Sequence, residues 1–164
     1  MIKFELTRKV HNEHGVFGEL RCEEAGIRCA TVERLQVPVD WKSLTATQRQ
    51  RYCIPACVYS MKYESNTDLS FGLLIKGTST WSRMRFSNNN RQEPNTIKVG
   101  VTATADGRVV KGDCVLKQID NFLHNLLIGG RIPACPVYGY IELSIRYDDD
   151  YHEGDYEPYD LLEE

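Results

Sequence analysis

Hydrophobic and polar residues alternate along several short segments of the chain, and this alternation predicts β-strands. In residues 2–10, Ile2, Phe4 and Leu6 alternate with polar neighbours, which is typical of a strand with one buried face. The clearest strand is 137–147, in which Ile141 and Leu143 continue one apolar face. Shorter segments of the same kind predict further strands at 18–23, 27–33, 57–63, 70–76, 81–86 and 97–101. Residues 11–18 are a polar turn region, and 18–34 is a predicted hairpin with a positive φ at Gly26.

One long segment has the period of a helix instead. Between residues 115 and 127 the apolar positions recur every three or four residues and form one broad stripe. Asp113 is a suitable N-cap, and Gly129 and Gly130 end the pattern. We therefore expect a helix over about 113–128 that packs on the sheet. The polar segment 43–51 predicts one or two further helical turns capped by Ser43.

The order of these elements predicts the fold class. Many strands, one late helix and a closing strand are typical of the α+β class. We expect a mainly antiparallel, β-rich sheet or partly open barrel, with the amphipathic helix packed on it. The strand–helix–strand order near the C-terminus can add one parallel pairing.

Charge divides the chain into two parts. Its 164 residues have a net charge of −3, but the last 17 hold nine acids and no Lys or Arg. The first 147 residues therefore carry a net charge of +6. This division predicts a single β-rich domain over 1–147 and an acidic tail over 148–164.

The acidic tail also contains apolar side chains. They are three tyrosines and two leucines: Tyr151, Tyr156, Tyr159, Leu161 and Leu162. One interpretation is a solvated tail that aids solubility. The other is a docking segment whose apolar residues bind the chain's own body or a neighbouring subunit, and these anchors favour it.

Motifs for common catalytic and metal sites are absent from the sequence. The six cysteines form no CxxC pair and match no zinc pattern, so we expect reduced thiols that fill core space, and no metal or cofactor. Cys114 is the one weak catalytic candidate, because a helix N-terminus lowers the pKa of a thiol. The first 20 residues have no apolar run of signal-peptide length and no segment is long enough to span a membrane. We expect a chain made in the cytoplasm, without a membrane partner.

A polar loop beside two arginines is the main candidate binding site in the body. Residues 87–95 are the most turn-prone stretch there, and their asparagines suit either a plain turn or a binding loop. Arg83 and Arg85 on one strand face form a small basic patch able to hold carboxylate or phosphate. Trp81 on the same face makes weak nucleic-acid binding conceivable. The candidate residues are Arg83, Arg85, Ser87, Asn88, Asn89, Asn90 and Arg91.

The order of several short motifs resembles a phage and bacterial domain family of unknown function. The matching segments are Leu6-Thr7-Arg8, residues 15–20, residues 26–33 and Ile54-Pro55 with Tyr59, and weaker matches cover 84–90 and 95–100. The family's IPxGxY, IHxGN and GCI motifs include a His and a Cys like the pair in L,D-transpeptidase-like peptidoglycan enzymes. Here Ser87 and Thr96 stand in their places, and a hydroxyl without a base is not an activated nucleophile. The resemblance therefore implies the scaffold and a phage-like origin without the reaction.

Together these features favour a non-catalytic assembly or binding protein, such as a bacteriophage virion structural or accessory component. Its partners would be other protein subunits, either copies of itself or virion proteins, docked through the acidic tail and the basic body. An alternative is a Cys-dependent, L,D-transpeptidase-like enzyme that acts on peptidoglycan through a displaced thiol such as Cys114. A lesser alternative is a nucleic-acid-binding protein.

Overall fold

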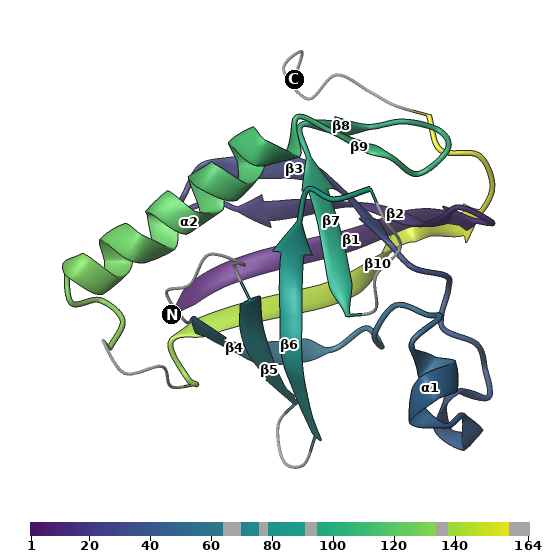
Figure 1. Ribbon diagram of the computed structural model, residues 1–164, viewed down its shortest axis with the longest axis horizontal. Coiled ribbons are helices and arrows are strands. Elements are labelled where there is room, and N and C mark those ends of the chain that lie inside the picture. The colour runs from purple at the N-terminus through teal and green to yellow at the C-terminus, as the bar shows by residue number, and fades with distance from the viewer. Residues whose placement is uncertain (64–69, 76–78, 91–94, 134–137, 158–164) are drawn as a thin grey trace.

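The strands of the computed structural model form one mixed sheet that closes into an eight-stranded barrel in the order β1-β10-β4-β5-β6-β7-β3-β2 (Figure 1). The structure describes residues 1–63, 70–75, 79–90, 95–133 and 138–157, with the side chains of 70–75 and 79–84 excepted. The strands are β1 (Ile2–Asn12), β2 (Gly15–Cys22), β3 (Ile27–Glu33), β4 (Val58–Tyr63), β5 (Ser70–Ile75), β6 (Ser79–Ser87), β7 (Thr96–Gly100) and β10 (Ile141–Glu153). The α+β class is thus confirmed, and the pairing of β1 with β2 closes the barrel.

Six of the strand pairings within the barrel are antiparallel and two are parallel, β1 with β10 and β6 with β7. The parallel β1–β10 ladder joins the two ends of the chain. The sequence predicted strands at nearly all of these places, but residues 11–18 are not a long turn. β1 continues to Asn12 and β2 begins at Gly15, so a tight turn joins them. Gly26 has the positive φ expected of it, 66°.

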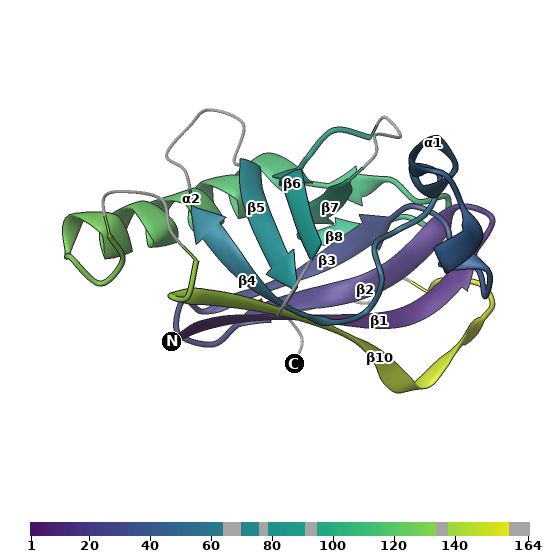
Figure 2. The ribbon, with the colours of Figure 1, turned by 90° about the horizontal axis from the view of Figure 1, so that it is seen from below.

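Helix α2 (Gly112–Ile128) covers one side of the barrel and completes its core (Figures 1 and 2). Its buried face includes Val115, Ile119 and Leu123, which belong to the same cluster as the inward residues of β1 and β10. The ring of Phe122 lies 6.3 Å from that of Phe4. The apolar stripe read from the sequence is therefore the face that packs, as amphipathic helices do.

The start of α2 differs from the prediction. Asp113 is not the N-cap; Lys111, with a φ of 56°, precedes the helix, and Asp113 lies in its first turn. Gly112 is required there by close packing, because a Cβ at this position would lie 2.5 Å from the Cβ of Asn88 and 2.6 Å from the carbonyl oxygen of Val99. No helix among the described residues is long and apolar enough to cross a membrane.

A second, smaller apolar cluster lies on the outer face of β2 and β3. The hairpin of β8 (Thr102–Ala103) and β9 (Val109–Val110) covers part of this face. The cluster consists of Val10, Phe17, Ala30, Val32, Ala103, Val109 and Tyr156. Tyr156 comes from the segment that the sequence placed in the acidic tail, so part of that segment packs on the body.

Between β3 and β4 the chain leaves the barrel and forms a small lobe at one end (Figure 1). It holds a 3-10 turn (Trp41–Ser43) and the short helix α1 (Ala46–Arg49). The predicted helical turns are present, but Thr45 caps α1 in place of Ser43. The hydroxyl of Thr45 accepts from the backbone N–H of Gln48, and the Gln48 side chain accepts from the N–H of Thr45.

Candidate functional site

An ion pair lies inside the barrel, between β1 and β3. Arg8 continues the inward face of β1 after Leu6, and Glu33 ends β3 on the inner side. The Arg8 Nε and Nη2 atoms donate to the two carboxylate oxygens of Glu33 at 3.0 and 2.7 Å. Nη2 also donates to the carbonyl of Ile54 at 2.7 Å, and Nη1 faces the hydroxyl of Tyr147 at 3.4 Å. The Arg8 side chain has no exposed surface, so its charge is balanced entirely by protein groups.

The surroundings of this pair keep it in its charged form. Burial alone would lower the pKa of Arg8, but the Glu33 carboxylate, with smaller effects of Cys53 and Tyr147, raises that pKa above its usual range. Burial raises the pKa of the neighbouring Cys53 to about 12, so this thiol stays protonated. The adjoining cavity measures only about 10 Å³ and is lined in part by Glu33, Cys53 and Thr96. Such a space holds at most one water molecule. The pair therefore stabilises the fold, and the cavity beside it has no room for a substrate.

Several residues that carried the family resemblance meet at this pair. Arg8 contacts both Glu33 and Ile54, although 25 and 46 residues separate them from Arg8. Thr96 lines the small cavity beside them. Ser87 lies on β6, where its Oγ accepts from the N–H of Asn89 at 3.0 Å.

No sequence motif marks Arg8 and Glu33 as site residues. A signal for them was present, because each occupies an inward position of an alternating strand. A charged residue on a buried face is rare unless it is paired. The sequence could therefore have indicated a buried pair, although not which two residues form it.

The polar loop after β6 forms hydrogen bonds with the start of α2 and with β9. The side-chain amide of Asn88 donates to the Asp113 carboxylate at the start of α2. Asn90 forms two hydrogen bonds with the backbone of Val109, one donated at 3.3 Å and one accepted at 2.7 Å. These asparagine amides hold the loop against α2 and β9. Asn89 contributes its backbone N–H to the turn.

The basic patch expected near this loop lies mostly outside the described side chains. Arg83 is on β6, but its side chain is among those that the structure does not describe, and Arg91 lies outside the described residues. Arg85 is half-buried, and its backbone N–H donates to the carbonyl of Asn95 at 3.2 Å.

The thiols are placed mainly as core residues. Cys22, Cys29 and Cys53 are buried, and burial raises the pKa of Cys29 to about 12 and that of Cys22 above its usual value. Cys114 is exposed in the first turn of α2, as its position in the sequence suggested. Among the described residues, no group of three or more His, Cys, Asp or Glu side chains could hold a metal ion.

Strand β10 extends into the segment that the sequence placed in the acidic tail. Residues 148–153 belong to the strand, which pairs with β1 up to His11 and Glu153. The register shifts on the way: Arg8 pairs with Tyr147, but Val10 pairs with His152. β10 therefore bulges away from β1 over its three consecutive aspartates, Asp148, Asp149 and Asp150, of which the last two are exposed.

The acidic segment is held in place by tyrosines and by backbone contacts. The Tyr151 ring stacks on His11 with centroids 5.1 Å apart, and its hydroxyl donates to the Gln36 side chain. Gly154 exchanges two 3.0 Å hydrogen bonds with the end of β1, from its N–H to the His11 carbonyl and from the Asn12 amide to its own carbonyl. The Tyr156 ring stacks on Phe17 at 4.5 Å. Two of the expected anchors thus pack on the chain's own body, while Tyr159, Leu161 and Leu162 lie outside the described residues.

The lobe between β3 and β4 carries the opposite charge. Residues 34–52 include four basic residues and one acidic residue, Asp40. Lys42 and Arg51 are exposed. Arg49 holds the lobe together, since its guanidinium covers the Trp41 ring at 5.1 Å and donates to the carbonyls of Trp41 and Lys42. The contact between Gln36 and Tyr151 joins this lobe to the acidic part of β10.

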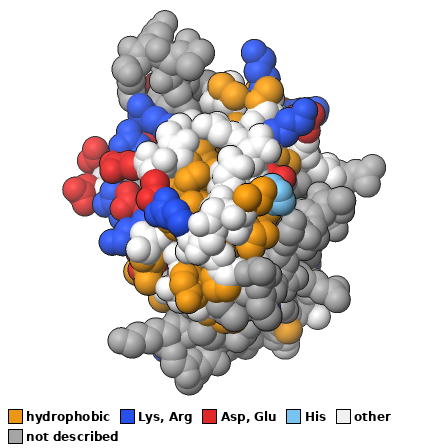
Figure 3. Space-filling model, turned by 90° about the vertical axis from the view of Figure 1, so that its left-hand side faces the viewer, with side chains coloured by type: hydrophobic (Ala, Val, Ile, Leu, Met, Phe, Trp, Pro, Cys, Tyr) orange, Lys and Arg blue, Asp and Glu red, His pale blue; other side chains and the backbone are white. Residues whose placement is uncertain are grey.

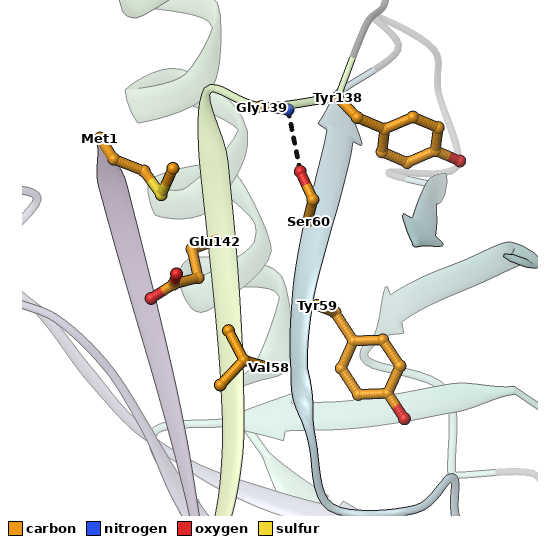
Figure 4. Close-up of a pocket in the computed structure, with 7 residues that line it drawn as sticks. All are labelled: Met1, Val58, Tyr59, Ser60, Tyr138, Gly139 and Glu142. Carbon is orange, nitrogen blue, oxygen red and sulfur yellow. Dashed lines mark hydrogen bonds between the residues drawn. The ribbon is translucent and has the colours of Figure 1, made fainter. Parts of the chain in front are cut away.

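A shallow pocket of about 390 Å³ lies at the other end of the molecule, on the outer face of β4 and β10 (Figure 4). Met1, Val58 and Tyr138 give it a mainly apolar lining, and Glu142 is the one carboxylate among the described lining residues. The Ser60 hydroxyl accepts from the N–H of Gly139 at 2.8 Å. Among the described lining residues, no nucleophile is paired with a base.

Charges of both signs mix around the N-terminus. A neighbouring pocket of about 270 Å³ is lined by Met1, Lys3, Glu5, Arg21, Glu23 and Glu24. Arg131 pairs with Glu24 at 2.9 Å. Figure 3 shows acidic and basic side chains gathered together on one side of the face turned towards the viewer. This end therefore differs from the other, where acid and base occupy separate segments.

Comparison of the chain with protein-family models, with curated proteins and with solved structures found no match. The resemblance to the phage and bacterial domain family stays a prediction, and the structural findings above rest on the geometry alone.

Proposed function

We propose that this chain is a non-catalytic assembly or binding protein of a bacteriophage particle, docked to other protein subunits through its acidic segment and its basic surfaces. The observation that carries the proposal is the fixed presentation of the acids. Strand pairing, Gly154 and Tyr156 hold residues 148–157 on the body, so Asp149 and Asp150 project from an ordered strand. An ordered charged surface suits recognition of a complementary partner, because little conformational entropy is lost on binding.

The arrangement of the interior argues against the enzyme alternative. Three thiols are buried, and burial raises the pKa of each, which disfavours the reactive thiolate. The cavity beside Arg8, Glu33 and Thr96 is too small for a peptide substrate. Native-state labelling tests the alternative directly. We expect Cys114 to react no faster than an ordinary exposed thiol, and a much faster reaction abolished in Cys114→Ser would favour an enzyme.

Co-sedimentation of the chain with assembled bacteriophage particles tests the assembly proposal. We expect the wild-type chain to sediment with particles and the variant Asp149→Lys/Asp150→Lys to remain in the supernatant. The control Glu23→Lys/Glu24→Lys makes the same change of charge at the opposite end and should still sediment. A chain truncated after Glu157 keeps every described contact and reports separately on Leu161 and Leu162. If wild type and Asp149→Lys/Asp150→Lys sediment alike, the proposal is wrong.

A further inference from the structure

Two surfaces of opposite charge lie next to each other at one end of the barrel. The acidic stretch, residues 148–157, has six acidic residues and no Lys or Arg. The basic lobe, residues 34–52, has four basic residues and one acidic residue. Both lie at the end away from the N-terminus in Figures 1 and 2, and the Tyr151–Gln36 contact joins them.

Among the described residues, the two surfaces do not neutralise each other by ion pairs. In the part of the chain that the structure describes, no ion pair links the acidic stretch to the basic lobe. Glu19 on β2 behaves differently, since Lys9, Arg21 and Arg28 all pair with its carboxylate. The charges around Glu19 thus find partners in the same chain, whereas Asp149, Asp150, Lys42 and Arg51 are exposed.

Apolar side chains are also exposed within and beside the two charged surfaces. Leu35, next to Gln36, is 38% exposed, and Tyr147, whose ring lies 4.5 Å from that of Tyr151, is 37% exposed. Val39 of the lobe is fully exposed. A patch with an apolar centre and charged margins has the composition of a protein interface.

The edge of β10 here favours docking by side chains over addition of a strand. The pairing of β10 with β4 runs from Ile141 to Ser144 and stops there. The N–H of the next residue, Ile145, donates to the carbonyl of Cys57. Beyond this point the described strands leave that edge uncovered. The bulge and the aspartates on it oppose pairing with another strand.

An acid surface beside a basic surface on the same chain is complementary to itself. A two-fold axis places the acidic stretch of each copy against the basic lobe of the other. The dimer then contains this acid–base contact twice. A partner of one charge would leave the other surface unmatched. Resting on the proposed function, we propose that the acidic stretch docks on the basic lobe of a second copy of this chain, in a two-fold dimer with Leu35 and Tyr147 near its centre.

Sedimentation velocity over a concentration series tests the dimer, using two charge-reversed variants. Asp149→Lys/Asp150→Lys reverses the stretch, and Lys42→Glu/Arg51→Glu reverses the lobe. We expect each variant alone to dimerise at least about tenfold more weakly than wild type. An equimolar mixture of the two restores both attractive contacts and should form a heterodimer. Salt at about 1 M, where the screening length is about 3 Å, should weaken the wild-type dimer.

The outcomes separate this inference from the proposed function. A wild-type chain that is monomeric at every concentration overturns the dimer, as does a mixture that associates no better than the single variants. If the wild type is monomeric but Asp149→Lys/Asp150→Lys still loses co-sedimentation with particles, the proposed function stands and its partner is a different protein. If the dimer and the heterodimer form but no particle is bound, the dimer stands and the particle proposal fails. Glu23→Lys/Glu24→Lys is the matched control and should dimerise like wild type.

Discussion

The two halves of β10 show how one strand can serve the fold and then the surface. From Ile141 to Ile145 it lies between β1 and β4, and its three inward side chains are no more than 3% exposed. Beyond Tyr147 it keeps β1 as its neighbour, bulges and carries acids. Burial of its side chains fixes the first half. The second half is held by its pairing with β1 and by contacts of Tyr151 and Gly154, and most of its acidic side chains remain exposed to solvent. Composition alone therefore does not mark the end of a domain, because an acidic segment can continue a strand.

The largest loss of stability is expected at the junction of the two halves, where Tyr147 covers Arg8 at 5.6 Å. Glu33→Gln keeps the shape of the side chain but leaves the Arg8 charge buried without its counter-charge. We expect the free energy of unfolding to fall by about 3–5 kcal/mol, measured by urea denaturation. Glu23→Gln, at an exposed position, is the control and should change little. A loss below about 1 kcal/mol would show that the pair is not sealed from water.

The inner half should be the next most sensitive. Leu143 on β10 is completely buried, so Leu143→Ala removes core contacts and leaves a cavity. The expected cost is about 2–5 kcal/mol in urea denaturation. Val58 on β4 is 53% exposed and pairs with the next outward residue of β10, Ser144, so Val58→Ala provides the comparison on the opposite face. Equal losses for the two variants would mean that the assignment of inner and outer faces is wrong.

The segment that follows the outer half should contribute less. Tyr156→Ala removes the ring that stacks on Phe17 and should cost about 2 kcal/mol, because the segment can detach without unfolding the barrel. Hydrogen exchange should show faster exchange at Gly154 while the N–H groups of β1 near Phe4 stay protected. Faster exchange throughout the barrel would instead make Tyr156 part of the main cooperative unit.

A small effect of pH is expected from the acid that the chain neutralises itself. Burial opposes ionisation of Glu19, but the hydrogen bond from Arg28 and the charge of Lys9 outweigh it and hold the pKa below its ordinary 4.5. A lowered pKa stabilises the folded state above about pH 4.5, and this contribution is lost as the pH falls through the folded-state value. Glu19→Gln should therefore lose stability near neutral pH and show a weaker acid dependence. Parallel pH profiles of wild type and variant would contradict this pairing.

Much of the fold follows from local patterns in the sequence. Alternation located the strands, and the stripe from Val115 to Leu127 located α2 to within one residue of its start. The barrel closure and the β1–β10 pairing could not be predicted, because they join residues far apart in the chain. The helix caps were misplaced because Asp113 and Ser43 are good caps in isolation, and the close packing of Gly112 and the reciprocal bonds of Thr45 decide otherwise.

The candidate sites were predictable to a smaller extent. The asparagines after β6 were identified as a special loop, but their hydrogen bonds to Asp113 and Val109 appear only once the hairpin and α2 are in place. The acidic segment was identified by its charge, and its tyrosines suggested docking on the body or on a neighbouring subunit; Tyr151 and Tyr156 lie on the body. That it begins as a strand was hidden, because consecutive aspartates have a low strand propensity.

The most direct test of the account compares Asp149→Lys/Asp150→Lys with wild type by sedimentation velocity, on protein shown by urea denaturation to be folded. Substitutions at exposed positions on the outer half of β10 should change the free energy of unfolding by no more than about 0.5 kcal/mol. We expect the variant to be as stable as wild type but no longer to associate with a second copy of the chain. A variant that associates as the wild type does would contradict the assignment of this surface to docking. A variant that unfolds would show that the acids serve the fold.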